Sequence, residues 1–500
     1  MKEINKKNKK KKNKKLKIDI LPKSVSSAAA FLVLLFAEAL FLLILGILDI
    51  LPGRYTAAIV LLIILIDAGV WFLFNSKKGS DSKPMIGLIV TITVLIVMNF
   101  GSFYLYNTYE TFSKISGEIV QTESFYVVAA KDGRYNDVKD IKEETVGVTE
   151  NETRTYKEAK GKLITKCGIE YDDESDLVTL GHRLVDEKGK KHDGIIFVSK
   201  NSYEMICENI ESFGKKTKVI YKIRVEVKSN NNSRKINVTE DSFNVYITGI
   251  DVFGDIDQVS RSDVNMIMTV NPKTKEILLT SIPRDMYVTL HSFGALDKLT
   301  HSGIYGVDET INTVEDWMDI DINYYVRLNF SMLVRIVNAI GGVDVKSEYS
   351  FKSAVSDYTY EKGMNHLDGK AALYFARERK AFKAEDAQRI KNQQIVLKAI
   401  INKVTGSTVL LTKYTQLLDA VEGTMQTDLS NKDISNLAKM QLNDFGKWKI
   451  KTISVKGTKS YEYTYSMGMR ELYVSIPVEK TVEQAKEKIN SVMYPVDEGK

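Results

Sequence analysis

The segment that decides the fold runs from Asn244 to Tyr287 and reads NVYITGIDVFGDIDQVSRSDVNMIMTVNPKTKEILLTSIPRDMY. Three short runs rich in β-branched residues predict strands over Val245–Ile250, Val264–Val270 and Glu276–Ile282. The residues Pro272–Lys275 form a turn signal between the last two runs, so these two strands are expected to form a hairpin.

The register of this hairpin brings charged side chains together. If Asn271 lies opposite Glu276, counting back along both strands places Asp263 opposite Arg284. Asp251 follows the first strand, and the loop after it returns to Asp263. Two carboxylates with neither a cation nor a proton between them repel each other. Because an arginine is close by, we expect a hard divalent metal ion and a phosphate at this end of the sheet.

Length and charge constrain the organisation of the chain. Its 500 residues exceed one ordinary domain, and its net charge of +6 is concentrated at one end. The first 23 residues are rich in lysine, which is typical of a solvated segment that keeps the N-terminus in the cytoplasm. Attraction to anionic lipids and binding of a cytoplasmic partner are alternatives. We expect no nucleic-acid partner, because this segment has no arginine or aromatic residue to contact bases.

Three apolar runs follow, Ser26–Ile50, Tyr55–Phe74 and Met85–Tyr106, and each is long enough to span a bilayer. The basic tail and the lysines between the second and third runs should both be cytoplasmic. An odd number of spans then places everything after about residue 107 outside the cell. We expect Glu38 and Asp67, inside the first two spans, to be protonated in helix–helix contacts rather than to transport ions.

Residues 108–235 predict a small α+β accessory domain with no recognisable chemistry, ending in the linker Ser229–Ser233. Its two cysteines, Cys167 and Cys207, are too few for a disulfide scaffold and form either one bridge or two unpaired core thiols. The expected strands and helices are Ser124–Ala130, Gly194–Val198 and Lys218–Val227, and Glu174–Leu184 and Ser202–Phe213.

Beyond Arg284, helices alternate with single strands, which predicts a mixed sheet covered by helices. Lys298 and His301 lie in a glycine-containing loop and are candidates for phosphate contact or proton transfer, or else a surface lysine and a capping histidine. The expected helices and strands of this region are Asp308–Met318, Phe330–Ile340, Val343–Glu348, Leu367–Phe375, Val409–Gly423, Asn431–Leu442, Trp448–Val455, Leu472–Pro477 and Thr481–Val492. The apolar residues of the second helix form either plain core or a slot for a lipid chain: Phe330, Leu333, Val334 and Val337.

A second informative segment, residues 363–404, carries polar side chains at helical spacing. Asp386, Arg389 and Gln393 are at positions i, i+3 and i+7, which is one face of a helix. A solvated helix with an ordinary Asp386–Arg389 pair is the alternative. Two further arginines, Arg377 and Arg379, lie just upstream. Since arginine binds phosphate oxygens through several planar hydrogen bonds, these arginines together with Arg284 point to a diphosphate site. Arg261 either binds phosphate as well or neutralises Asp263.

Five motifs in a fixed order now resemble a known family. ITGID, RSDVNMIMTVNP, LLTSIPRDMYV, FARERK and DAQRIKNQQ are similar to the LytR-CpsA-Psr family of cell-envelope enzymes. The resemblance runs through Asn244–Val404 and, less strongly, to Val492. Three spans followed by an accessory domain resemble the CpsA-type members. The sequence departs from the family pattern at Ala387–Gln388 and Lys391, where small residues are often found.

The resemblance implies an α/β fold, a mixed sheet flanked by helices (an α/β/α sandwich), that buries a polyprenyl diphosphate. We therefore expect four parts: a basic cytoplasmic tail over residues 1–23, three transmembrane helices over 24–107, an extracellular accessory domain over 108–235 and an extracellular catalytic domain over 236–495. The expected fold class is thus α/β with an N-terminal three-helix membrane region and a small α+β accessory domain.

The resemblance also implies a reaction, the transfer of a glycopolymer from its polyprenyl-diphosphate carrier to peptidoglycan. It assigns Asp251 and Asp263 to Mg²⁺, and Asp386 to an acidic position that we group with Arg284 and Arg389 as catalytic. Asp263 and Asp386 are the candidate bases for the acceptor hydroxyl. The three-span resemblance favours capsular polysaccharide over teichoic acid as the polymer. The residues implied to bind the diphosphate are Arg284, Arg377, Arg379, Arg389 and Gln393.

Two other functions fit the same residues. With water as the acceptor, the site would be a polyprenyl-diphosphate pyrophosphatase. Without catalysis, the chain would be a membrane regulator of envelope polysaccharide synthesis whose lysine tail meets a cytoplasmic partner.

Overall fold

The structure is a computed structural model that describes residues 24–49, 51–75, 82–116, 120–149, 153–228, 236–250, 256–406, 409–444 and 446–495. The chain forms two compact units, Met1–Asn107 and Thr108–Lys500. The predicted basic tail, the predicted linker Ser229–Ser233 and the predicted metal ligand Asp251 lie outside the described residues.

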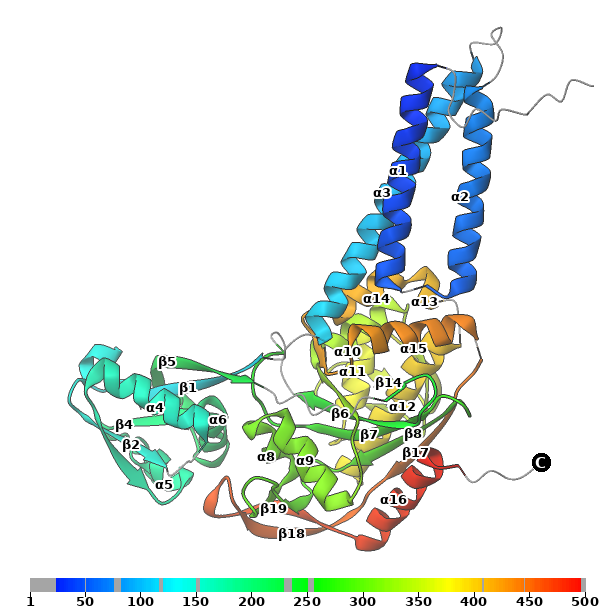
Figure 1. The fold of residues 1–500 in the computed structure, drawn as a ribbon. Helices are drawn as coiled ribbons and strands as arrows, with labels where there is room; N and C mark the ends of the chain where they lie inside the picture. Colours follow the sequence, from blue (N-terminus) through cyan, green and yellow to red (C-terminus); the bar gives the residue numbers. More distant parts are fainter. Residues whose placement is uncertain are drawn as a thin grey trace, which may run out of the picture. The chain divides into compact units, whose positions relative to one another are not determined.

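The first unit consists of apolar helices (Figure 1). They are α1 (Val25–Leu48), α2 (Gly53–Phe74) and the first part of α3 (Ser82–Ser116), and all three are long and apolar enough to cross a membrane. Glu38 is buried and Asp67 half-buried among these helices, as expected for acids at helix–helix contacts. The helix α3 continues well past the predicted end at Tyr106, because Phe112 and Ile115 in its last turns pack against the second unit's own core.

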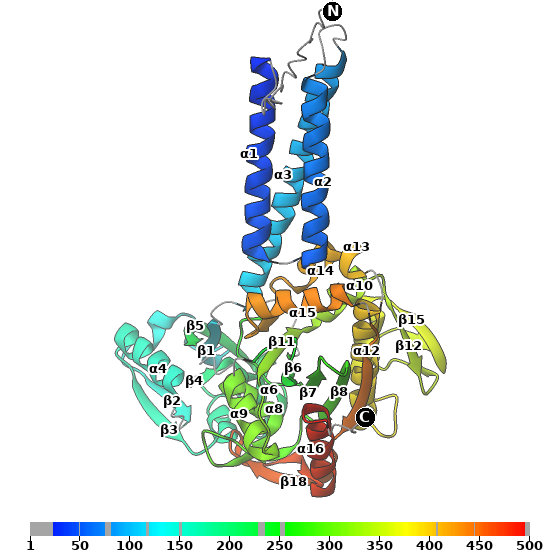
Figure 2. The same ribbon diagram turned by 45° about the vertical axis from the view of Figure 1, so that its right-hand side comes forward.

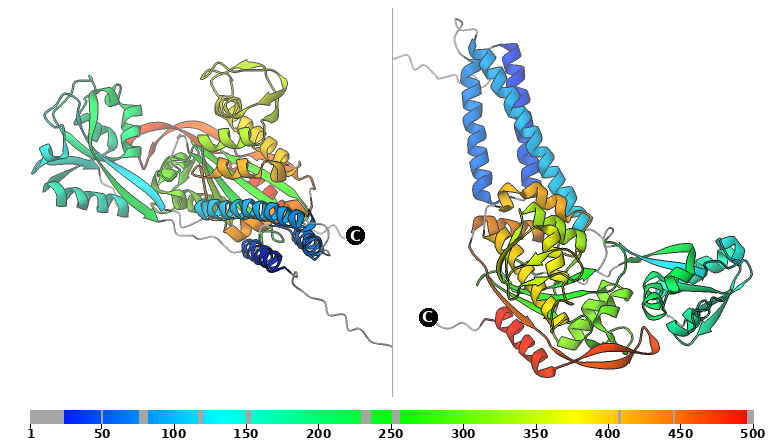
Figure 3. Two further views of the ribbon diagram at one scale, coloured as in Figure 1. Left: turned by 90° about the horizontal axis from the view of Figure 1, so that it is seen from above. Right: turned by 180° about the vertical axis from the view of Figure 1, so that it is seen from behind.

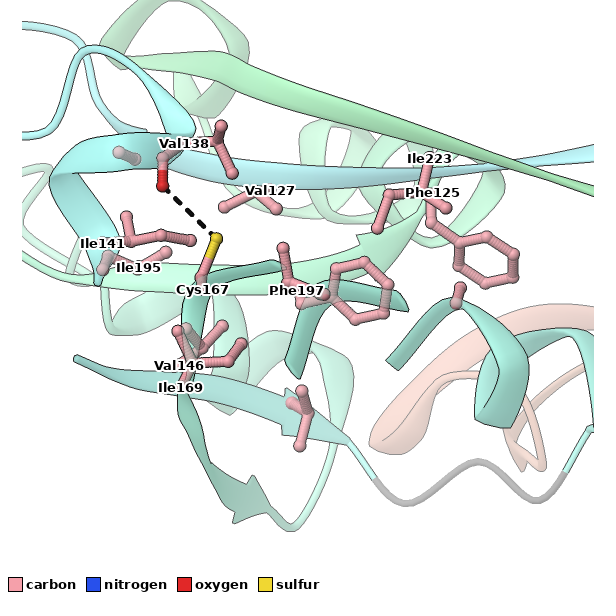
Figure 4. Packing of buried hydrophobic residues seen from close by; sticks show 14 of the residues in the cluster. Phe125, Val127, Val138, Ile141, Val146, Cys167, Ile169, Ile195, Phe197 and Ile223 are labelled. Atoms are coloured by element: carbon pink, nitrogen blue, oxygen red, sulfur yellow. Dashed lines mark hydrogen bonds between the residues drawn. The ribbon is translucent and has the colours of Figure 1, made fainter. Parts of the chain in front are cut away.

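The second unit contains a five-stranded accessory sheet in the order β3-β2-β4-β1-β5. Its core contains Phe125 on β1 stacked 5.7 Å from Phe197 on β4 (Figure 4). Tyr156 on α4 packs against both rings. The helix α4 was not predicted. Its elements are β1 (Val120–Ala130), η1 (Val138–Ile141), β2 (Thr145–Thr149), α4 (Arg154–Cys167), β3 (Glu170–Glu174), α5 (Leu177–His182), β4 (Ile195–Ser199), α6 (Lys200–Asn209), α7 (Phe213–Lys216) and β5 (Thr217–Lys228).

Both cysteines are free thiols. Cys167 is buried at the end of α4, with its Sγ 3.5 Å from the carbonyl oxygen of Val138 (Figure 4). Cys207 lies on α6 and packs against a different apolar cluster. Of the two alternatives left open by the sequence, the structure therefore shows the pair of unbridged thiols.

The main sheet has six strands in the order β16-β11-β6-β7-β8-β17. Neighbouring strands are parallel at β11–β6 and β8–β17 and antiparallel elsewhere, so the sheet is mixed, as predicted. The predicted central strands are confirmed almost to the residue. The strands are β6 (Phe243–Ile250), β7 (Val264–Asn271), β8 (Glu276–Ile282), β11 (Tyr324–Asn329), β16 (Met425–Thr427) and β17 (Lys449–Ser454).

Helices cover both faces of the main sheet (Figures 2 and 3). Alternation along the strands sends Tyr246, Ile267 and Leu278 to one face and their neighbours to the other. The first face packs on α8 (Leu299–Ser302), α9 (Val307–Met318) and α16 (Glu479–Met493), and the second on α12 (Asp386–Thr405) and α15 (Asn431–Asn443). This is the expected α/β/α sandwich.

Shorter elements surround the sandwich. The helix α10 ends before Gly341 and Gly342, whose φ angles of 76° and 83° provide the predicted glycine cap. The strand β18, which pairs with β19, was not predicted. These elements are β9 (Tyr287–Thr289), β10 (Leu296–Lys298), η2 (Gly303–Tyr305), α10 (Phe330–Ala339), β12 (Val343–Ser347), β13 (Phe351–Lys352), β14 (Thr359–Tyr360), β15 (Gly363–Leu367), α11 (Gly369–Arg377), α13 (Val409–Thr412), α14 (Tyr414–Val421), β18 (Gly457–Thr464) and β19 (Gly468–Pro477).

Candidate active site

The hairpin register is the predicted one. Asn271 lies opposite Glu276, and the ladder continues to Asn265 opposite Ile282. Two residues beyond its end on each strand, Nη1 of Arg284 donates a hydrogen bond to Oδ1 of Asp263 at 2.5 Å. The backbone geometry of the hairpin therefore builds the ion pair that the sequence predicted.

Asp263 also lies beside the end of β6. Its backbone N–H donates to the carbonyl oxygen of Gly249 at 2.9 Å. The hydroxyl of Thr300 on α8 donates to Oδ1 of Asp263 at 3.4 Å. Three separate chain segments thus contact Asp263. Gly249 holds its backbone, and Arg284 and Thr300 hold its carboxylate at the edge of the sheet.

Asp263 and Arg284 border a pocket of about 220 Å³, which we call the arginine pocket. It combines five cationic side chains with two carboxylates, so its interior is positively charged. All five residues implied to bind the diphosphate line it. They lie just after β8, at the end of α11, in the α11–α12 turn and on α12. The lining residues are Asp263, Val264, Arg284, Phe330, Val355, Arg377, Glu378, Arg379, Lys380, Arg389 and Gln393.

The rotation of α12 explains why Arg389 and Gln393 face this pocket. On an adjacent face of the helix, Gln388 and Asn392 are buried, and Nδ2 of Asn392 donates to the carbonyl oxygen of Phe375 on α11 at 3.0 Å. Lys391 is exposed at the surface. The positions that depart from the family pattern therefore lie away from the pocket and leave its lining intact.

Asp386 does not line the pocket but supports it. Its Oδ1 lies 2.6 Å from Nη2 of Arg389, so the ordinary charge pair considered from the sequence is present. The same arginine still reaches the pocket, which means that the pairing and the phosphate-binding interpretation are compatible.

Two guanidinium nitrogens in the pocket lack hydrogen-bond partners among the described residues. Nε of Arg284 and Nε of Arg389 are both buried and unpaired in this sense. Buried N–H groups without a partner are rare in folded proteins and indicate an acceptor that binds there. Both arginines line the same positively charged pocket, although Nε of Arg284 lies 3.7 Å from Oδ2 of Asp285, and an anion would match this lining.

The electrostatics of the two arginines differ. Burial lowers the pKa of Arg284, but the carboxylates of Asp263, Asp285 and Asp386 outweigh it and raise the pKa overall. Burial also lowers the pKa of Arg389, and nearby Arg284 reinforces that effect so that its pKa falls below the usual value. Arg389 therefore carries positive charge that the surrounding side chains do not fully offset.

The turn between α11 and α12 is held by Glu378. Its buried carboxylate accepts hydrogen bonds from the hydroxyl of Ser353 at 2.8 Å and from the N–H groups of Ala354 and Ala381 at 2.7 and 3.1 Å. Burial raises the pKa of Glu378, yet these hydrogen bonds bring it below the ordinary value. The glutamate thereby fixes the segment that presents Arg377 and Arg379.

Lys298 and His301 are not in the arginine pocket. Nζ of Lys298 pairs with Oδ1 of Asp285 at 3.0 Å, and both side chains are largely buried. Nδ1 of His301 lies 2.6 Å from Oδ1 of Asp297 and 2.8 Å from the hydroxyl of Ser466. Neither residue lines the arginine pocket, and both have buried structural partners rather than the surface-lysine and capping roles considered from the sequence.

Arg261 pairs with Glu208 on helix α6 of the accessory domain. Its two terminal nitrogens each donate to a carboxylate oxygen of Glu208 at 2.8 Å. Other residues of segment 256–263 are held by the same domain, since Thr122 N donates to Asp257 O at 2.7 Å and Nδ2 of Asn201 to Val259 O at 3.2 Å. The segment leading to Asp263 is therefore clamped between the two parts of the unit.

Sequence reasoning missed three charged residues of this region: Glu378, Lys380 and Asp285. Glu378 and Lys380 lie within the FARERK motif that drew attention to the arginines, so the cluster itself was the available signal. Asp285 directly follows Arg284 and lies 3.7 Å from its Nε. No spacing rule would have paired Asp285 with Lys298, because that contact depends on how β9 and β10 fold back.

Comparisons with known proteins agree with these features. The LytR_cpsA_psr family model matches residues 209–490. The polyisoprenyl-teichoic acid–peptidoglycan teichoic acid transferase TagU of Enterococcus faecalis is 36% identical over 44% of this chain and 71% of its own length. TagU of Bacillus subtilis is 34% identical over 46% of this chain and 74% of its own length.

Solved structures give a further comparison. The crystal structure of B. subtilis TagV is 27% identical, with a TM-score of 0.43, over 51% of this chain and 98% of the other. The structure titled TagT bound to LIIa-WTA is 29% identical, with a TM-score of 0.43, over 53% of this chain and 96% of the other. The family model covers more than half of the chain, and so this protein belongs to the LytR_cpsA_psr family.

Proposed function

We propose that this protein transfers a glycopolymer from a polyprenyl-diphosphate carrier to peptidoglycan. The observation that carries the proposal is the arginine pocket, in which the unpaired Nε groups of Arg284 and Arg389 face one positively charged cavity. The names of the TagU relatives, teichoic acid transferases that act on peptidoglycan, support the same reaction class.

The polyprenyl chain needs apolar surface next to the pocket. Phe330, which lines the pocket, begins the apolar helix α10 and lies with its ring 4.2 Å from Cζ of Arg377. Leu333 and Val334 on the same helix are only half-buried. On the central strands, Val326 and Leu328 are also half-buried although helices cover that sheet face. Such incompletely buried apolar side chains are suited to contact a lipid chain.

The chain's own residues account for the main requirements of phosphoryl transfer, which are positioning and charge neutralisation. Arg284 and Arg389 would bind the oxygens of the reacting phosphate, and Arg377 and Arg379 those of the second. Asp386 orients Arg389 through their 2.6 Å contact. Asp263 orients Arg284 and borders the pocket, and with Asp386 it is one of the two candidate bases for the acceptor hydroxyl.

We extend the proposal to Mg²⁺. This ion prefers oxygen ligands and is typically held by one or two carboxylates together with phosphate oxygens and water. Asp263, a carboxylate at the edge of a phosphate-sized pocket, fits that donor set, and Asp251 would complete it from outside the described residues. When bound, the ion would neutralise charge on the diphosphate oxygens.

The polymer and the orientation in the membrane belong to the proposal as well. Three N-terminal apolar helices suit an integral membrane protein, and lysines flanking α1 and lying before α3 favour an extracellular second unit. The three-helix arrangement favours capsular polysaccharide, whereas the TagU relatives are named for teichoic acid. Both are glycopolymers of the cell envelope.

Mass spectrometry of co-purified lipid tests the binding step. Full-length protein extracted from its membrane should carry a polyprenyl diphosphate or its glycosylated form, because the pocket offers unpaired donors to a diphosphate. The Arg284→Ala and Arg389→Ala variants should lose most of this lipid, while Lys391→Ala, an exposed position on the same helix, should keep it. Equal lipid content in all four proteins would contradict the assignment of the pocket.

Hydrolysis is the rival reaction, and it is distinguished by its product. Purified protein given polyprenyl-diphosphate-linked glycan, but no peptidoglycan, should release little glycan phosphate and little polyprenyl phosphate. Rapid release of glycan phosphate that added peptidoglycan does not divert into a covalent product would instead identify a pyrophosphatase.

A further inference from the structure

A second pocket lies within the second unit, where the accessory sheet meets the turn between β18 and β19. Its volume is about 300 Å³, and we call it the serine pocket. The accessory sheet and its helices contribute Glu123, Ser199 and Ser202, while the β18–β19 turn contributes Tyr465 and Ser466. None of the described residues that line it is a lysine or an arginine.

The serine pocket borders a packed interface. Ile304 on η2 and Met467 after the β18–β19 turn are buried in one apolar cluster with Leu177 and Leu180 of α5. Side chains from both parts of the unit thus interlock next to the pocket. The cavity is a shaped feature of that interface, because its walls are anchored by buried contacts.

The hydroxyl groups of the pocket are held in place. The hydroxyls of Ser199 and Ser202 lie 2.9 Å apart, and that of Ser199 also accepts the N–H of Ser202 at 3.0 Å. Behind Ser466, fully buried Asp297 accepts its backbone N–H at 2.8 Å, and Nδ1 of His301 lies 2.8 Å from its hydroxyl. This network gives the buried His301 its polar partners and holds the hydroxyl of Ser466 in the wall of the cavity.

An aromatic surface completes the lining. The ring of Tyr465 stacks on Phe293 with centroids 4.7 Å apart and an interplanar angle of 28°. Tyr305 lies 6.3 Å from Tyr465 and 4.6 Å from Phe293. Tyr465 is nevertheless 44% exposed. Aromatic faces attract the weakly positive C–H groups of sugar rings, and fixed hydroxyl and carboxylate oxygens pair with sugar hydroxyls.

The serine pocket is closely linked to the arginine pocket. Thr300 donates to Asp263 at the edge of the arginine pocket, and the next residue, His301, contacts Ser466 in the serine pocket. Both residues belong to the single turn of α8. The walls of the two pockets are therefore connected through adjacent residues of α8.

We propose that the serine pocket binds neutral sugar units of a glycan that reacts at the arginine pocket. The carboxylate of Asp176, without a cation among the described lining residues, disfavours phosphate and other anions there. The sugars belong either to the polymer being donated or to the peptidoglycan being extended, and both present the same chemistry. The inference rests on the proposed function, since it supplies the glycan, and it gives the accessory domain a direct role in substrate binding.

Saccharide binding without turnover tests this inference. Full-length protein in lipid nanodiscs would be titrated with N-acetylglucosaminyl-N-acetylmuramyl dipeptide in one arm and with lipid-free oligosaccharide from the cell's own wall glycopolymer in the other. Saturation-transfer NMR should detect binding in one arm, which identifies the acceptor or the donor. Tyr465→Ala should weaken that binding about tenfold and Ser466→Ala several-fold. Tyr461→Ala, on the same hairpin and 66% exposed, should leave it unchanged.

A measurement on the unmodified chain guards against misfolded variants. Nitration of Tyr465 by tetranitromethane should slow when the bound saccharide is present, and nitration of Tyr461 should not. Binding that is equal in wild type and Tyr465→Ala, or absent from both arms, overturns the inference. Because binding needs no catalysis, saccharide binding at Tyr465 without polymer transfer would contradict only the proposed function. Transfer with an unchanged KM in Tyr465→Ala would contradict only this inference.

Discussion

The described carboxylates only partly neutralise the positive charge of Arg389 and of the arginines near it. Its Nη2 contacts Asp386 at 2.6 Å, while its buried Nε has no partner among the described residues. Burial and the nearby Arg284 lower its pKa, so binding of an anion would relieve an unfavourable arrangement. The geometry of the guanidinium, in addition to its charge, is what this position requires.

Replacing Arg389 by lysine tests that distinction. Arg389→Lys keeps a positive charge but removes the planar set of donors, so we expect transfer to fall about 100-fold, nearly as far as in Arg389→Ala. Lys391→Arg on the exposed face of the same helix is the matched control and should retain full activity. The measurement is the initial rate of glycan transfer. Near-normal activity of Arg389→Lys would show that charge alone suffices.

Glu123 makes stability depend on pH. Burial raises its pKa to about 7, against an ordinary value of 4.5, and the hydrogen bond from Thr155 only partly offsets that effect. The folded state therefore holds the proton more tightly than the unfolded chain. The contribution of Glu123 to the free energy of unfolding is fully present below about pH 4.5. It is lost as pH rises through about 7, and it amounts to at most about 3 kcal/mol.

The Glu123→Gln variant should abolish this dependence, because glutamine does not titrate. The thermal midpoint of the wild type should fall relative to that of the variant as pH rises from 5 to 8. Thermal unfolding followed by circular dichroism at several pH values measures the difference. A constant difference across this range would mean that Glu123 titrates normally.

At the scale of elements, the sequence predicted what local rules determine. A four-residue turn fixed the β7–β8 register, and the register alone placed Asp263 beside Arg284. Helical spacing placed Arg389 and Gln393 on one face of α12. These predictions succeed because each depends on residues that are close in the chain and on a fixed backbone period.

Features that depend on distant contacts were not predicted. The strand β18 carries exposed tyrosines and pairs with β19, but its alternation marks no buried face. Arg261 looked like a phosphate ligand because it lies two residues from Asp263, and only the folding of α6 against it shows that Glu208 is its partner. Asp251 lies outside the described residues, so its role in binding metal stays a prediction.

The Arg261–Glu208 pair should control the segment that leads to Asp263. We expect Arg261→Glu to lower transfer several-fold and to speed amide exchange at Ser262 and Asp263, whose N–H groups donate to Thr300 and Gly249 carbonyls. The reciprocal swap, Arg261→Glu with Glu208→Arg, should restore most of both losses.

Hydrogen exchange read by mass spectrometry follows the segment, and the transfer rate follows the site. Glu211→Arg, an equal change of charge at an exposed position near Glu208, should alter neither. If the double swap rescues nothing, the pair is not what holds segment 256–263 in place.

At the scale of the whole molecule, the expected fold class is confirmed, with three apolar helices, an accessory α+β sheet and a mixed sheet between helices. Hydropathy indicated the helices because a span requires a long apolar run. The identity of the polymer has no such signal, because sugar contacts come from loops and from side chains assembled across distant elements. The serine pocket, built from β1, α6 and the β18–β19 turn, is an example.

The lysine tail provides a prediction at this scale. Deleting residues 2–16 should leave polymer attachment to the wall intact, because Lys77, Lys78 and Lys83 remain to direct the topology. Radiolabelled polymer that co-purifies with washed cell walls gives the measurement. Loss of attachment with normal membrane insertion would favour a regulator that acts through a cytoplasmic partner.

Reconstituted transfer tests the central claim most directly. Full-length protein in nanodiscs would receive polyprenyl-diphosphate-linked glycan and peptidoglycan with Mg²⁺, and the covalent product would be quantified. We predict that the wild type links the glycan to peptidoglycan, and that Arg284→Ala and Arg389→Ala each reduce the rate at least about 100-fold. Undiminished transfer by both variants, or no transfer by a wild type that retains bound lipid, would contradict the account.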